Sequence, residues 1–139
     1  MRRFVLLLYS VVGIVSIAMG ALYLLAPRFM PYHAVAIGRD WAALSDNEQV
    51  LFRALLDVAG AGWLALGVAV IWLVIVPVRR GERWARLVVP CLLLIFYVPT
   101  LLATLSVLEN TPASPPWWGN LVALAATVAA FILDKPFKR

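Results

Sequence analysis

A small set of side chains in this 139-residue chain has the chemistry of a binding or catalytic site. An imidazole, a carboxylate and a guanidinium together provide a general base and an anion-binding group. The chain has one histidine, and an arginine and an aspartate stand four residues apart on a predicted helix. Aromatic residues could form walls beside them. The candidate site residues are His33, Glu48, Arg53, Asp57, Trp63 and Tyr97.

The same inventory excludes most cofactor chemistry. A single histidine cannot supply both axial ligands of a bis-histidine haem. The single cysteine, Cys91, is expected near the opposite face of the molecule, roughly 20 Å or more from His33 by helix rise, so the two cannot share a metal. The sequence has no P-loop, Rossmann glycine fingerprint, HExxH or GxSxG motif. We therefore predict no metal and no cofactor.

The elements that position these residues are predicted to be membrane-spanning helices. Apolar residues make up 64% of the chain and charged residues 14%, with a mean hydropathy of +0.93, whereas a soluble domain averages roughly half apolar and a quarter charged. A soluble fold of this size could not bury so much apolar surface. Four apolar stretches are long enough to cross a bilayer, at about residues 4–25, 45–77, 87–108 and 117–133. We predict an all-α polytopic membrane protein, a four-helix bundle forming a single domain over residues 1–139.

Basic residues are distributed unequally between the two ends of the predicted spans. Lys and Arg collect at the cytoplasmic ends of membrane helices. Four spans place nine of the twelve basic residues on one side and only Arg28, Arg39 and Arg53 on the other. This pattern predicts that both termini are cytoplasmic. Nucleic-acid binding is not expected, because the charges flank the spans instead of forming a solvated face with aromatic platforms.

Four arginines between the second and third spans have two interpretations. They fix the orientation of the chain in the membrane. Alternatively, they also bind an anionic lipid headgroup, since each juxtamembrane basic residue adds about 1 kcal/mol of attraction near an acidic surface. The residues of this candidate headgroup site are Arg79, Arg80, Arg83 and Arg86.

Small residues at helical spacing predict close contacts between helices, because they let two backbones approach each other. The residues are Ser10, Gly13, Ser16 and Gly20 in the first span, and Ala61, Ala65 and Ala69, beside Gly60 and Gly67, in the second. These contacts either hold one bundle together or form the face of a homodimer.

The segment before the second span, residues 26–44, is expected to lie on the outer membrane surface as an interfacial loop, because apolar and polar residues alternate in it. Pro31 can begin a short helix there and Gly38 can end it. Ser45 and Glu48 have the spacing of a capping box, which predicts that the next helix starts at Ser45. His33 is either a hydrogen-bonded residue of this interface or part of a site.

Two other polar groups also have open interpretations. Arg53 and Asp57 lie near the predicted outer edge of the membrane, where they either anchor the helix or contribute to a site. Tyr97, Thr100 and Thr104 share one face of the third span. Their hydroxyls either satisfy carbonyls that a proline leaves without a donor, or line a pocket.

The layout of the spans resembles a known family. A first span that ends in LYLLAPRFM, an outward loop, the glycine-rich second span FRALLDVAGAGWLALGVAV, a basic turn and two further spans are similar to the small DoxX-like four-helix membrane proteins of bacteria. The resemblance implies a compact bundle in a bacterial inner membrane and, in some members, an accessory role beside a membrane redox enzyme. It carries over no catalytic residue.

Two functions are therefore expected from the sequence, and a transporter ranks third because no charged pathway crosses the spans. The first is a non-enzymatic structural or accessory protein that binds membrane lipid, a partner membrane protein or a second copy of itself. The second is an enzymatic site or a pocket at the outer leaflet for a small amphiphile such as a quinone or isoprenoid, with His33 and Asp57 as polar anchors.

Overall fold

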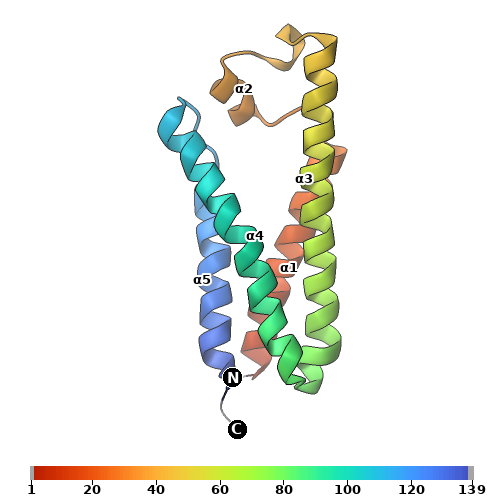
Figure 1. Ribbon diagram of the computed structural model, residues 1–139, viewed down its shortest axis with the longest axis vertical. Coiled ribbons are helices and arrows are strands. Elements are labelled where there is room, and N and C mark those ends of the chain that lie inside the picture. Colours follow the sequence, from red (N-terminus) through yellow and green to blue (C-terminus); the bar gives the residue numbers. More distant parts are fainter. Residues whose placement is uncertain (1, 138–139) are drawn as a thin grey trace.

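The computed structural model describes residues 2–137, and their regular structure is entirely helical, without a strand. The elements are α1 (Arg2–Leu25), α2 (Pro31–Ile37), η1 (Trp41–Ala43), α3 (Asp46–Leu73), η2 (Val74–Val78), α4 (Arg83–Asn110) and α5 (Trp117–Asp134). Four helices, counting α3 with η2 as one, are long and apolar enough to cross a membrane. The prediction of an all-helical chain with four membrane-capable helices is confirmed. These helices form an elongated bundle, and α2 covers one of its ends (Figure 1).

The closest helix contact joins α1 and α3, which run in opposite directions. A Cβ atom on Gly20 would lie 2.5 Å from the amide nitrogen of Leu64 and 2.8 Å from the carbonyl oxygen of Gly60. One on Gly67 would lie 2.7 Å from the carbonyl oxygen of Gly13. Backbone therefore touches backbone at two points seven residues apart on each helix, and only glycine fits there.

The alanine stripe of α3 takes no part in this contact. Ala61 and Ala65 are exposed and, with Ala69 and Trp72, they line an open groove on the outer surface of the bundle. The interpretation that this stripe packs inside the bundle is therefore wrong. Glycines on the neighbouring face form the contact instead, because they allow a closer approach than alanine does.

The chain reverses direction between α3 and α4 through two special backbone features. Pro77 lacks an amide donor and cannot continue a regular α-helix without a clash, and it lies in η2, a single turn of wider π-helix. Gly81 then adopts a φ of 87°, which a residue without a side chain reaches at little cost.

Polar side chains tie the helix ends together at the end of the bundle where this turn lies. The Arg2 guanidinium donates to the carbonyl oxygens of Val78, at 3.2 Å, and Arg79. Arg86 at the start of α4 bonds Asp134 at the end of α5, with 2.8 Å between Nε and Oδ2 and 2.6 Å between Nη2 and the backbone oxygen. The start of α1 and the end of α5 thus share one end of the molecule (Figure 1).

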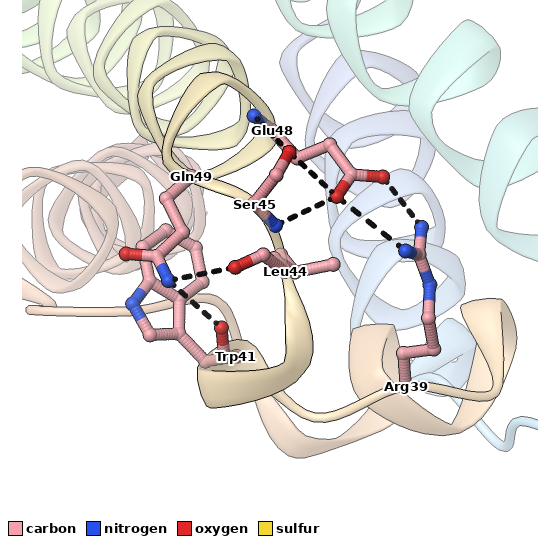
Figure 2. Close-up of polar contacts among 6 residues, drawn as sticks. All are labelled: Arg39, Trp41, Leu44, Ser45, Glu48 and Gln49. Atoms are coloured by element: carbon pink, nitrogen blue, oxygen red, sulfur yellow. Dashed lines mark hydrogen bonds and ion pairs between the residues drawn. The ribbon is translucent and has the colours of Figure 1, made fainter.

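The opposite end is organised by the predicted capping box at the start of α3, which is confirmed. The hydroxyl of Ser45 accepts from the Glu48 amide at 3.4 Å, and the Glu48 carboxylate accepts from the Ser45 amide at 2.8 Å. Figure 2 shows that Arg39 also donates to Glu48, at 2.7 Å, and that the Gln49 amide reaches the carbonyl of Trp41 at 3.2 Å. These bonds hold the loop between α2 and α3 against the helix that follows it.

Candidate functional site

A cavity of about 520 Å³ lies between the long helices at the end of the bundle that α2 covers. Its walls come from α1, α3, α4 and α5, the α2 residues Tyr32 and His33 form its roof, and it is partly open to the outside. Towards this end, α4 leans away from α3 (Figure 1). The lining residues whose side chains carry a polar group are Tyr23, Tyr32, His33, Trp63, Tyr97, Thr100, Thr104, Trp118 and Asn120.

The floor of the cavity is aromatic and apolar. The ring of Trp63 packs edge to face against Tyr97, with ring centroids 5.3 Å apart, and against Phe96 at 4.7 Å. The Tyr97 hydroxyl lies 2.9 Å from Ser16 Oγ, and Ser16 itself donates to the carbonyl of Val12 at 2.9 Å. This buried pair ties α1 to α4 directly beneath the cavity.

The threonine hydroxyls on the α4 wall of the cavity already donate their protons to backbone carbonyls. Thr100 donates to the carbonyl of Phe96 at 2.7 Å, and Thr104 donates to that of Thr100 at 2.7 Å. Asn120 of α5 donates to Thr104 Oγ1 at 3.2 Å. The interpretation that these threonines line a pocket is confirmed. The other interpretation is wrong, because the carbonyl that Pro99 leaves without a donor is that of Ile95, four residues before it, whereas each threonine bonds to the carbonyl four residues before itself.

The roof is the short helix α2, which begins at Pro31 and is followed by Gly38 with a φ of 69°, as predicted. It is fastened to α1 by the Tyr23 and Tyr32 hydroxyls, which lie 2.7 Å apart. Within α2, His33 Nδ1 accepts a hydrogen bond from the Met30 amide at 3.2 Å. The imidazole is therefore built into the start of the helix, and its ring centroid lies 4.2 Å from that of Tyr32.

Burial lowers the pKa of His33 below its ordinary value of 6.5 and raises the pKa of Tyr32. The folded roof therefore binds fewer protons than the unfolded segment does over the range between the lowered pKa and about 6.5. Its stability is fully present above pH 6.5 or so. It falls as the pH drops through that range, and below the lowered pKa no further loss follows.

Lowering the pH from about 7.5 to about 5 is therefore expected to increase hydrogen exchange of the α2 amides several-fold. Protonation at Nδ1 removes the acceptor for the Met30 amide. The measurement is hydrogen–deuterium exchange with mass spectrometry, using the amides of α5 as the internal reference for intrinsic pH effects. A His33→Gln variant should lose the excess change, and an equal change in both proteins would contradict the assignment to His33.

The structure brings three of the six candidate site residues together and leaves three apart. His33, Trp63 and Tyr97 line the cavity. The Arg53 guanidinium pairs with the Asp57 carboxylate at 3.3 Å. It also donates to the carbonyl oxygen of Leu24, at 2.8 Å, and to that of Ala26. These two residues and Glu48 anchor the first turns of α3 and do not line the cavity.

Sequence reasoning missed Tyr23, Tyr32 and Asn120 as cavity residues. The signal for the tyrosines was their place near the predicted outer ends of apolar segments, where aromatic rings usually mark the lipid interface. Asn120 was the lone amide near the start of an otherwise apolar helix, and such residues seek a hydrogen-bond partner on another helix.

At the other end of the bundle, the four arginines of the candidate headgroup site differ in exposure and in pairing. Arg79, Arg80 and Arg83 are exposed, whereas Arg86 is held by Asp134. Among residues 2–137, no group of three or more His, Cys, Asp or Glu side chains is arranged to hold a metal ion.

The fold and the cavity define a class: a small helical protein with four membrane-capable helices and, between them, a partly open cavity that is polar at its roof and mostly apolar at its floor. Comparison of the chain with protein-family models, curated proteins and solved structures finds no match. The geometry of the cavity is therefore the basis for assigning a function.

Proposed function

We propose that this chain is a multi-pass membrane protein that binds a small amphiphile in the cavity beneath α2. The observation that carries the proposal is the cavity itself, whose volume of about 520 Å³ falls within the range of roughly 300–1,000 Å³ typical of small-molecule sites. Its polar groups gather near α2, while Trp63, Tyr97 and Met19 offer an apolar interior. Quinones and isoprenoids combine a polar end with an apolar body in this way.

The proposal predicts that filling the cavity prevents the ligand from binding. Ala103 lines the cavity, and its neighbour Leu102 is 61% exposed on the outside of α4. We expect wild-type protein extracted in native nanodiscs to carry a stoichiometric small molecule detectable by mass spectrometry. The Ala103→Trp variant should retain about tenfold less, a loss of roughly 1.4 kcal/mol or more in binding.

The matched control for this experiment is Leu102→Trp, which adds the same indole to the lipid-facing surface and should retain the wild-type amount. Equal retention in both variants would contradict a ligand in this cavity. Extraction of wild-type protein with only bulk lipid and a co-purifying polypeptide would favour the accessory role. The exposed alanines of α3, beside Trp72, offer a face where a second helix could approach closely.

The placement in the membrane is part of the proposal. We propose a bacterial inner membrane, as the DoxX-like layout implies, with both termini on the cytoplasmic side. The charge distribution supports this orientation, because Arg79, Arg80 and Arg83 lie exposed at the same end as the start of α1 and the end of α5. The roof helix α2 then lies at the outer leaflet.

Cysteine labelling tests this orientation directly. In a Cys91→Ser background, Ser114→Cys lies in the connection between α4 and α5, and Glu82→Cys lies in the turn before α4. A membrane-impermeant maleimide added to intact spheroplasts is expected to label the first variant and to reach the second only after permeabilisation. The reverse pattern would overturn the orientation and would place α2 at the inner leaflet.

A further inference from the structure

We propose that the cavity selects an uncharged amphiphile whose polar end carries a hydrogen-bond-accepting oxygen, and that Nε2–H of His33 donates to this oxygen. The inference rests on the proposed function and specifies its ligand class. It follows from two features of the cavity. The first is that no charged side chain lines it, and the second is the position of the hydrogen-bond donors that make no bond within the protein.

The first feature is the absence of an ionised partner for a charged ligand. Within residues 2–137, no Asp, Glu, Lys or Arg lines the cavity. Among the charged groups near the roof, Arg39 pairs with Glu48 and Arg53 pairs with Asp57, while Arg28 and Asp40 line a different pocket, beside Pro31 and Trp41. A carboxylate or diphosphate in this cavity would lose its hydration without gaining an opposite charge, which strongly disfavours its binding.

The second feature is the state of the hydroxyl protons on the floor and on the α4 wall of the cavity. The protons of Thr100 and Thr104 go to backbone carbonyls. Because Ser16 donates its proton to the Val12 carbonyl, the Tyr97 hydroxyl must donate to Ser16 Oγ. These three groups line the floor and the wall without a free proton, so they do not attract an acceptor atom.

Free donors gather near the roof, and the floor adds one more, the indole N–H of Trp63. His33 Nδ1 accepts from the Met30 amide, so the neutral ring carries its proton on Nε2. Burial lowers the pKa of this residue, which keeps the ring neutral near pH 7. One hydroxyl proton of the Tyr23 and Tyr32 pair and the second amide proton of Asn120 are also unused by the bonds described. Donors in excess at one end of a cavity favour an accepting oxygen there.

The floor determines the other end of the ligand. From Thr104 to Tyr97 the α4 wall descends seven residues, or roughly 10 Å at 1.5 Å per residue. Over this distance the lining changes from hydroxyl and amide groups to Trp63, Tyr97 and Val15. An alcohol, ketone or quinone oxygen at the roof would therefore place an apolar body against these side chains.

Three probes with one tail and different ends test this inference. Farnesene, farnesol and farnesyl diphosphate share an apolar isoprenoid body but carry no polar end, an uncharged hydroxyl and a charged diphosphate, respectively. The bound fraction of each is measured by native mass spectrometry of purified full-length protein in nanodiscs of fixed lipid content. We expect farnesol to bind about tenfold more tightly than either of the other two.

Variants of His33 identify the donor. His33→Ala should lower the affinity for farnesol about fivefold and leave that for farnesene unchanged. His33→Gln, which keeps an N–H donor, should recover part of the loss. The wild-type comparison stands on its own if α2 is disturbed in either variant, because it needs no substitution.

The outcomes separate the ligand class from the proposed function. Equal binding of farnesene and farnesol, or tighter binding of the diphosphate, would overturn the inference while leaving amphiphile binding in place. Unchanged farnesol affinity in His33→Ala would overturn the assignment of the donor. Failure of all three probes to bind wild-type protein, together with failure of Ala103→Trp to change the retained material, would overturn both the inference and the function.

Discussion

Replacing Gly20 by alanine is expected to lower the free energy of unfolding by about 2–3 kcal/mol, near the upper end of the cost of overpacking a well-packed interior. The added methyl carbon would lie 2.5 Å from a backbone nitrogen and 2.8 Å from a backbone oxygen of α3. Neither atom belongs to a flexible side chain, so the helices themselves must separate. The measurement is reversible denaturation of purified protein in mixed micelles with increasing sodium dodecyl sulfate.

Gly62 provides the matched control, because it lies on the same helix pair and its Cβ would meet nothing nearer than Phe96 at 3.9 Å. Gly62→Ala should be neutral or slightly stabilising, since alanine favours a helix by up to about 1 kcal/mol. Gly67→Ala should resemble Gly20→Ala, as its Cβ would lie 2.7 Å from the Gly13 carbonyl. Equal stability of Gly20→Ala and Gly62→Ala would contradict the close backbone contact of α1 and α3.

Removing Arg86 is expected to produce the second large effect. Asp134 is only 9% exposed and accepts from the guanidinium at 2.8 Å. Arg86→Met leaves this carboxylate without its partner at low exposure, and we expect a loss of about 2–3 kcal/mol in the free energy of unfolding, somewhat less than for a fully buried pair. The same denaturation experiment measures it.

A double variant distinguishes an unpaired charge from lost packing. Arg86→Met combined with Asp134→Leu removes both charges and should recover most of the stability, because replacing a buried ion pair by apolar residues is often neutral. Arg83→Met, an exposed arginine on the same helix, should change stability by less than about 0.5 kcal/mol. If the double variant is as unstable as the single one, the loss comes from packing and not from the carboxylate.

Features that depend on the hydropathy of a segment, or on contacts between residues close in sequence, could be predicted from the sequence. Four membrane-capable helices follow from hydropathy, because the length of an apolar run decides whether it can cross a bilayer. The bonds between Ser45 and Glu48, and between Arg53 and Asp57, join residues within four positions of each other. Helix geometry alone brings such pairs into reach.

Features set by tertiary packing could not be predicted. The glycines of α3 recur after seven residues and the alanines after four, so both sets lie along a face of the helix. Only the position of α1 decides that Gly60 and Gly67 form the contact. The bond between Arg86 and Asp134 joins residues 48 positions apart. Both charged residues are present in the sequence, but no local spacing indicates that they form a pair.

The candidate site was predicted in part for the same reason. His33, Trp63 and Tyr97 come from three different helices and meet at one cavity. Asp57 was expected beside His33 but is held by its own helix neighbour, Arg53. A nearby opposite charge on the same helix competes with any distant partner, and here the local pair forms.

The apolar floor of the cavity also bears on how any affinity must be measured. A compound with a body that suits Trp63 and Tyr97 dissolves in lipid far better than in water, by about 0.8 kcal/mol for each buried methylene. Nearly all of it then resides in the membrane, and occupancy of the protein follows its mole fraction there. Doubling the lipid at constant total compound would thus roughly halve the effective dose, so titrations are comparable only when expressed per lipid molecule.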